Sequence, residues 1–360
     1  MKKKIINGLL QILGIMIVGR IIGYTVGKIA GDSLSSVDKP NIILFLITGV
    51  IAFILHIIVH EAGHLVFGLL SGYKFVSFRV FDFKIIKDEN GKLSFRYEKI
   101  AGTGGQCLMR ATEYVEGKFK YKLYLLGGVI FNVLFSIVFW LILPSYYTLL
   151  FALIGFTLAF LNLIPMGFND GMTFYHASKD ETTRFVLYLQ LEYVYYQSIG
   201  KNLLIEKPEI VEKINSLQIT NTNYLTDSLE FIKLDGLEYF FEFDALYNES
   251  RKLYVERDNL LPVYKVELMA LLVKLISLVN PEDKLLNELM NDKSLKIRLK
   301  QKNPQTKSIL ATYEYGVKLN NEKALNLISE ARKFKNKAPN LYVQNLEMRY
   351  CDFLEEKILR

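Results

Sequence analysis

Long apolar runs dominate the first half of this 360-residue chain, whereas mixed polar sequence dominates the second half. A helix that crosses the hydrocarbon core of a bilayer needs about 20 largely apolar residues. Pro40 and Pro144 bound some of these runs, because proline does not continue a helix. The pattern predicts an α-helical integral membrane bundle with about four transmembrane helices, at Ile5–Ala30, Asn41–Leu70, Tyr121–Leu143 and Tyr146–Pro165.

The spacing of apolar residues changes between the second and third apolar runs. Lys74–Lys87 and Lys92–Ile100 partly alternate apolar and polar residues, and Asn90-Gly91 lies between them. Asn-Gly between two alternating runs is a strong hairpin signal. We therefore expect a small membrane-associated β-hairpin at about residues 74–100, followed by a flexible glycine-rich segment at residues 102–105.

The chain after about Thr183 has the pattern of amphipathic helices. Asn-Pro pairs at 280–281 and 303–304 punctuate it. The sequence predicts a membrane-embedded domain at residues 1–175 that carries the hairpin, and a soluble all-α cytoplasmic domain at residues 176–360. The clearest helical patterns are Thr183–Ile199, Asp244–Asp258, Val266–Val279 and Glu322–Phe334.

The positive charge belongs to the apolar half of the chain. Residues 1–180 contain 18 Lys and Arg against 11 Asp and Glu, whereas residues 181–360 contain 26 of each. Such a bias indicates membrane topology, since Lys and Arg concentrate in cytoplasmic loops, and it argues against nucleic acid as a partner. Three lysines precede the first run, and ten Lys and Arg fall in residues 71–120. We expect a multi-pass protein with cytoplasmic N- and C-termini; frequent Lys, Ile and Asn favour a bacterial cell membrane.

The second apolar run contains His60-Glu61-Ala62-Gly63-His64, an H-E-x-x-H pattern. Residues i and i+4 share one helix face, so both imidazoles can reach one metal ion. Glu61 then lies beside the metal, where it can take a proton from water. Five residues alone are weak evidence, but ionisable residues inside a membrane are rare and usually functional.

Zinc in catalytic sites takes three protein ligands and leaves a fourth position open. Asp170 is the candidate third ligand. It follows the fourth apolar run, which ends on the same membrane face as His60 and His64. We expect Pro165 and Gly167 to break the helix there, and Gly171 to permit an unusual backbone conformation beside the carboxylate.

Two further residues compete for the metal. His56 shares the helix face of His60, but it lies about 12 Å along the helix from His64, too far for one ion to bind all three. An outer role that orients a ligand suits His56 better. Cys107 offers a thiol, but no second cysteine lies near it, and we interpret it as a packed small residue.

These residues resemble the site-2 protease family of intramembrane metalloproteases. The family pairs H-E-x-x-H with N-x-x-P-x-x-x-x-D-G, which is matched by Asn162 to Gly171, and with G-x-x-x-N, which is matched by Gly128 to Asn132. The resemblance covers roughly residues 41–175. It implies one zinc ion on His60, His64 and Asp170, with Glu61 as the catalytic base. It also implies that Asn132, Asn162, Gly104 and Gly105 lie near the substrate.

The activity that the resemblance implies is a zinc metalloendopeptidase acting on membrane-embedded or signal-peptide-like protein substrates. The rival class is a non-catalytic membrane protein on the same fold, such as a peptide-binding, immunity or transport accessory protein. A zinc enzyme that acts on lipid is a further alternative. Turnover that requires Glu61 separates the protease from the binding protein.

Overall fold

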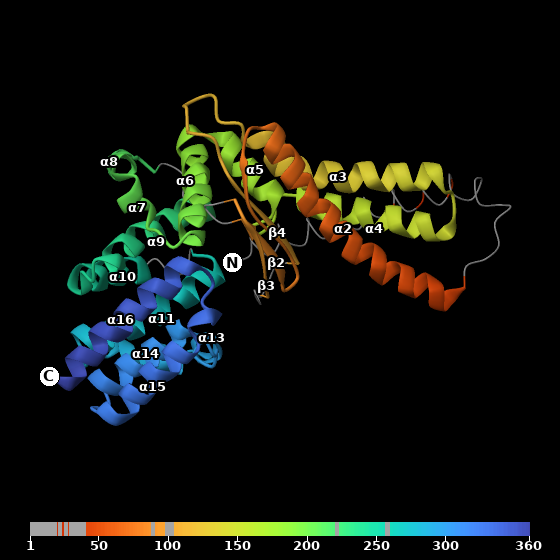
Figure 1. The fold of residues 1–360 in the computed structure, drawn as a ribbon. Helices are drawn as coiled ribbons and strands as arrows, with labels where there is room; N and C mark the ends of the chain where they lie inside the picture. Colours follow the sequence, from red (N-terminus) through yellow and green to blue (C-terminus); the bar gives the residue numbers. More distant parts are fainter. Residues whose placement is uncertain are drawn as a thin grey trace. The chain divides into compact units, whose positions relative to one another are not determined.

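The computed structural model describes Arg20, Tyr24, Lys28 and residues 41–87, 91–97, 104–219, 223–255 and 260–360 (Figure 1). Their contacts divide the chain into two compact units. One unit comprises the residues up to Ser71 together with Gly104–Cys107 and Lys120–Tyr175. The other comprises Gly72–Thr103, Leu108–Phe119 and His176–Arg360. The domains expected at residues 1–175 and 176–360 stay a prediction.

Three helices within the described residues are long and apolar enough to cross a membrane: α2 (Ile42–Leu70), α3 (Tyr121–Ile142) and α4 (Tyr146–Leu163). Figure 1 shows α3 and α4 running side by side. Their bounds agree within two residues with the three later apolar runs. Apart from Arg20, Tyr24 and Lys28, the first run lies outside the described residues, so a total of four crossings stays a prediction.

Glycines let the membrane helices approach closely. A Cβ on Gly63 of α2 would lie 2.2 Å from the carbonyl oxygen of Gly127 on α3. A Cβ on Gly155 of α4 would lie 2.2 Å from the His56 ring of α2. Small residues are common where transmembrane helices cross, because packing there replaces the hydrophobic effect. The close crossings bring the polar residues of α2 into contact with both neighbouring helices.

The fourth apolar run ends in a helix break. α4 stops at Leu163, and α5 (Asp170–Lys179) begins seven residues later, after Gly167 with a φ of 61°. The Asn169 amide donates to the Ile164 carbonyl at 2.7 Å and so holds the turn. Gly171 does not have a positive φ, so our expectation for its backbone is wrong. A side chain is excluded there instead, since a Cβ would lie 2.2 Å from the Leu163 carbonyl oxygen.

The expected hairpin belongs to a four-stranded sheet with the order β3-β2-β1-β4. β2 and β3 pair antiparallel, as predicted. The first alternating run is two strands instead of one, because Phe81 takes a φ of 51° and reverses the chain. The glycine-rich segment leads into a fourth strand that the pattern did not indicate. The strands are Lys74–Val80 (β1), Phe83–Lys87 (β2), Leu93–Tyr97 (β3) and Gly105–Arg110 (β4).

The sheet exposes aromatic side chains on one face and buries charged side chains on the other. On one face, Phe83, Phe95 and Tyr97 are 72, 83 and 71 % exposed. On the other face, Arg79 and its cross-strand partner Lys84 are buried. Soluble sheets usually bury the apolar face, so an exposed apolar patch indicates a surface that contacts another apolar phase or partner.

The remaining described elements are helical. The four clearest helical patterns in the sequence correspond to α6, α10, α11 and α15. Their core contains two clusters of buried side chains, one centred on α11 and one joining α14, α15 and α16. The elements are α6 (Glu181–Ser198), α7 (Leu203–Glu206), α8 (Pro208–Ser216), α9 (Tyr224–Tyr239), α10 (Phe243–Val255), α11 (Pro262–Val279), α12 (Leu285–Asn291), α13 (Lys293–Arg298), α14 (Pro304–Gly316), α15 (Asn321–Lys333), η2 (Lys335–Lys337) and α16 (Leu341–Leu359).

Candidate metal centre

Three metal-ligating side chains converge inside the membrane unit. His60 and His64 come from consecutive turns of α2, and Asp170 is the first residue of α5. The two Nε2 atoms lie 3.2 Å apart, and Asp170 Oδ2 lies 2.9 and 3.3 Å from them. Bonds of about 2.0–2.1 Å to a tetrahedral zinc ion imply ligand atoms about 3.3 Å apart. The spacing and the nitrogen and oxygen donors therefore fit a zinc ion.

The hydrogen bond of His64 occupies its Nδ1 and leaves its Nε2 free to bind a metal. Its Nδ1 lies 2.7 Å from the backbone carbonyl oxygen of Tyr124. A carbonyl only accepts, so Nδ1 carries the proton and donates it. Nε2 is then the atom that can ligate, and it faces His60 and Asp170. Backbone carbonyls commonly fix metal-binding histidines in this way.

A buried chain of three side chains orients His60. The His56 Nε2 lies 3.0 Å from the Phe151 carbonyl oxygen and must donate to it. In the structure the Asn132 Oδ1 lies 3.2 Å from the His56 Nδ1, and the Asn132 Nδ2 lies 3.4 Å from the His60 Nδ1. The two ends of an amide have the same shape, and the hydrogen-bond network decides between them. A neutral, buried His56 that donates at Nε2 must accept at Nδ1, so we infer the exchanged amide, with its nitrogen toward His56 and its oxygen toward the His60 Nδ1.

This hydrogen-bond network places the His60 proton on Nδ1, so the His60 Nε2 is free to bind the metal. His56 thus contacts Asn132, which in turn contacts His60, and it has the outer orienting role that its position on α2 suggests.

The third ligand is held as a carboxylate. Burial alone would raise the pKa of the Asp170 carboxyl, but the positive charge and the Nε2–H hydrogen bonds of His64 and His60 lower that pKa well below its usual range when Nε2 carries a proton in place of a metal. Asp170 is therefore ionised near neutral pH, which is the form that ligates a metal.

One face of α3 serves the metal centre. Tyr124, Gly128 and Asn132 are spaced four residues apart and so share this face. A Cβ on Gly128 would lie 2.4 Å from the His60 ring, so only glycine leaves room for the imidazole. The G-x-x-x-N pattern identifies two of these residues. Tyr124 was missed, although extending the same spacing back by one turn finds it.

Glu61 lies against the start of β4. Its carboxyl is buried and accepts a hydrogen bond from the Cys107 backbone. A Cβ on Gly105 would lie 2.5 Å from the Glu61 Oε1. Gly104 faces Ile57 instead, since a Cβ there would lie 3.2 Å from the Ile57 side chain. Gly105 therefore lets the strand backbone approach the candidate general base.

Two other candidates are placed differently. The Asn162 amide donates to the Leu158 carbonyl of its own helix at 3.0 Å. Cys107 is buried and is not part of the His60, His64 and Asp170 group. That Asn132, Asn162, Gly104 and Gly105 lie near a substrate stays a prediction.

We expect Asn132→Leu to weaken zinc binding by about 10- to 100-fold, the usual effect of removing an outer hydrogen-bond partner of a ligand. Leucine fills similar space but cannot hold the His60 Nδ1. The measurement is competition with a chromophoric chelator. Asn162→Leu is the matched control, since the Asn162 amide donates to its own helix, and its zinc affinity should be unchanged. Equal affinities for both variants would contradict the orienting role.

A partly buried His-His-Asp group, with both histidines on an apolar helix and a buried glutamate beside them, defines a candidate membrane metallopeptidase. Residues 48–148 match the model of peptidase family M50, the site-2 protease family. The match includes His60, Glu61, His64 and Asn132, while Asp170 lies beyond it. Comparison with curated proteins and with solved structures gave no match. The family indicates a membrane-located metallopeptidase hydrolase.

Proposed function

We propose that the protein is an intramembrane zinc metalloendopeptidase that cleaves membrane-embedded or signal-peptide-like substrates. The observation that carries the proposal is the convergence of His60, His64 and Asp170 on one point, with each free histidine nitrogen turned inward. The neighbouring Glu61 can act as a general base, which peptide hydrolysis requires and peptide binding alone does not. The apolar helices around the group favour a substrate that enters from the membrane.

The chemistry divides between the metal and the chain. A zinc ion bound at this group would supply Lewis acidity toward the scissile carbonyl and the attacking water. Glu61 takes a proton from that water and returns it to the leaving amine. His60, His64 and Asp170 fix the position of the reaction relative to Glu61. The strand backbone at Gly105 shields Glu61 from one side.

We further propose that the bilayer contacts the sheet as well as the helices, in a multi-pass protein of a bacterial cell membrane with both termini cytoplasmic. Only three residues separate the end of α2 from the start of β1, which keeps the sheet close to the membrane surface. The exposed rings of Phe83, Phe95 and Tyr97 suit the membrane interface, where aromatic residues are enriched.

The decisive experiment compares peptides released from membranes of cells that make the wild type or Glu61→Gln. The glutamine keeps the shape of the side chain but cannot accept the proton. Mass spectrometry should find peptides that end within transmembrane or signal-peptide segments only with the wild type. Zinc content, measured by inductively coupled plasma mass spectrometry, should be equal in the two proteins.

The protease proposal would be contradicted by identical peptide pools, provided that both proteins are folded and zinc-loaded and that candidate substrates are present. They would favour a non-catalytic peptide-binding protein on the same fold. Released lipid fragments in place of peptides would assign the hydrolysis to lipid.

A further inference from the structure

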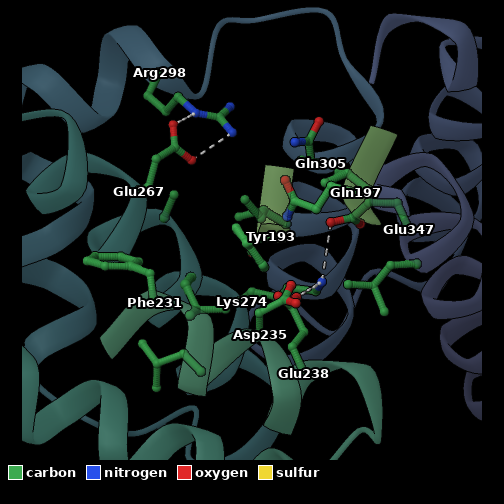
Figure 2. A pocket seen from close by; sticks show the side chains of 16 residues that line it. Tyr193, Gln197, Phe231, Asp235, Glu238, Glu267, Lys274, Arg298, Gln305 and Glu347 are labelled. Carbon is green, nitrogen blue, oxygen red and sulfur yellow. Dashed lines mark hydrogen bonds and ion pairs between the residues drawn. The ribbon is translucent and has the colours of Figure 1, made fainter. Parts of the chain in front are cut away.

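Two buried glutamates of this protein are held in different ways. Glu347 lines a polar cavity of about 200 Å³ among the C-terminal helices, where the Lys274 Nζ lies 3.6 Å from its carboxylate (Figure 2). A lysine can follow its carboxylate, because the charge is carried on a flexible stem. The buried Glu61 carboxyl accepts a hydrogen bond from the Cys107 backbone instead. A backbone N–H moves only with its strand, so the position of Glu61 depends on the position of β4.

A second side chain holds the backbone of Cys107. Its carbonyl oxygen accepts a hydrogen bond from the Tyr124 hydroxyl at 3.0 Å, and both residues are buried. The N–H and the C=O of one strand residue point to the same side of the strand. That side of β4 therefore contacts Glu61 of α2 through the N–H and Tyr124 of α3 through the carbonyl. All three residues belong to the same compact unit.

Tyr124 also contacts a candidate zinc ligand. Its backbone carbonyl accepts a hydrogen bond from the His64 Nδ1 at 2.7 Å, and the centroids of the two rings lie 5.6 Å apart. The tyrosine ring is buried and has only two side-chain torsions, so its hydroxyl has little freedom to move. Tyr124 thus connects a candidate ligand of the metal to the strand that holds the candidate general base.

We propose that Tyr124 is a positioning residue for peptide hydrolysis. Its hydroxyl fixes the β4 backbone at Cys107, and that backbone fixes Glu61 relative to the zinc ligands. The hydroxyl proton is donated to the Cys107 carbonyl, so Tyr124 acts through the strand and not on the substrate. This inference rests on the proposed protease function, because the position of a general base affects the rate only where a proton is transferred.

Tyr124→Phe removes the hydroxyl and keeps the rest of this arrangement. The phenylalanine ring fills the same space, and the backbone carbonyl still accepts from His64. The buried Cys107 carbonyl loses a donor, which is unfavourable, so β4 shifts to find another. Since a displacement of about 1 Å at a reacting group can cost about 100-fold in rate, we expect kcat to fall by about ten- to 100-fold.

The kinetic test measures kcat and KM with a substrate found in the membrane peptide pools, and zinc affinity by competition with a chelator. A lower kcat of Tyr124→Phe, with KM and zinc affinity at the wild-type level, is the expected result. An unchanged kcat would overturn the proposal. A raised KM alone would assign the hydroxyl to substrate binding, and a loss of zinc would assign it to the ligands, so either result would also contradict it.

Tyr147→Phe is the matched control, because it removes the same atom from another membrane helix. The Tyr147 hydroxyl accepts a hydrogen bond from the Asn41 backbone N–H at 3.2 Å. Asn41 lies about 28 Å from His60 along α2. The kcat, KM and zinc affinity of this variant should equal those of the wild type.

Hydrogen–deuterium exchange of the full-length protein in nanodiscs tests the strand without any need for activity. Amides exchange faster where local opening becomes easier. The amides of residues 104–110 should therefore exchange faster in Tyr124→Phe than in the wild type, and at the wild-type rate in Tyr147→Phe. Glu61→Ala should also speed this exchange, because it removes the acceptor of the Cys107 N–H. Unchanged exchange in zinc-loaded Tyr124→Phe would overturn the proposal.

The two measurements separate the failure of this inference from the failure of the protease proposal. If the wild type cleaves its substrate and Tyr124→Phe cleaves it equally fast, the positioning role is wrong and the protease proposal is unaffected. If the wild type releases no peptides, the protease proposal fails and the positioning role fails with it, whatever the exchange data show about the strand.

Discussion

Asp170→Asn is expected to abolish peptide cleavage and to weaken zinc binding by more than about 100-fold. Loss of an outer partner already costs about 10- to 100-fold, and Asp170 is a candidate ligand itself. Asparagine keeps the shape but loses the charge, and its amide is a poorer zinc ligand. The measurement is zinc per protein after dialysis against a weak chelator, together with cleavage of a substrate found in the membrane peptide pools.

Asp180→Asn provides the control for this change. Asp180 accepts from the Thr183 backbone as the N-cap of α6, a role that asparagine fills equally well. This variant should retain its zinc. Full zinc occupancy in Asp170→Asn would rule out Asp170 as a ligand and reopen the choice of the third ligand.

The membrane helices could be predicted from sequence because their signal is local. α2, α3 and α4 are continuous apolar runs, and Asn41 and Ser145 supply side-chain caps at the beginning of α2 and α4. A run of that length has few alternatives in a bilayer, since every backbone group must be satisfied within the segment. The bounds therefore follow from the apolar runs and their prolines with little dependence on tertiary contacts.

The sequence predicts the ligand residues of the candidate metal centre, but it does not predict the hydrogen bonds that orient them. The spacing of His60 and His64 places them on one helix face, and helix orientation brings Asp170 to the same membrane side. The partner of His64 could not be found in this way, because it is the backbone carbonyl of Tyr124 and any residue type supplies one. The direction of the Asn132 amide depends on the hydrogen bond between His56 and the backbone carbonyl of Phe151. The sequence does not indicate this bond either, because every residue has such a carbonyl.

The sheet and the C-terminal cavity depend on distant contacts. Phe81 adopts a positive φ although it is not glycine, so no residue type indicated the turn that divides β1 from β2. The strand β4 follows a glycine-rich segment that favours flexibility when considered alone. The cavity residues Tyr193, Asp235 and Glu347 come from three helices far apart in the sequence, and only the packed fold brings them together.

The closeness of Gly105 to Glu61 leads to a prediction that separates proton transfer from metal binding. In Gly105→Ala, the new Cβ would start 2.5 Å from the Glu61 Oε1. Ordinary contact needs about 3.5 Å, so the carboxyl must move by about 1 Å. A shift of this size at a reacting group can cost about 100-fold in rate. We expect kcat for peptide cleavage to fall by about 100-fold while zinc affinity stays at the wild-type level.

Gly104→Ala is the matched control, because it adds the same methyl group one residue earlier in the chain. Its Cβ would lie 3.2 Å from the Cδ1 of Ile57, the far end of a side chain that can turn away. The kcat of this variant should stay within a few-fold of the wild type. If both alanine variants lose activity equally, the segment acts through its flexibility or through substrate contact. A selective loss in Gly105→Ala, with zinc retained, means instead that the strand backbone sets the position of the general base.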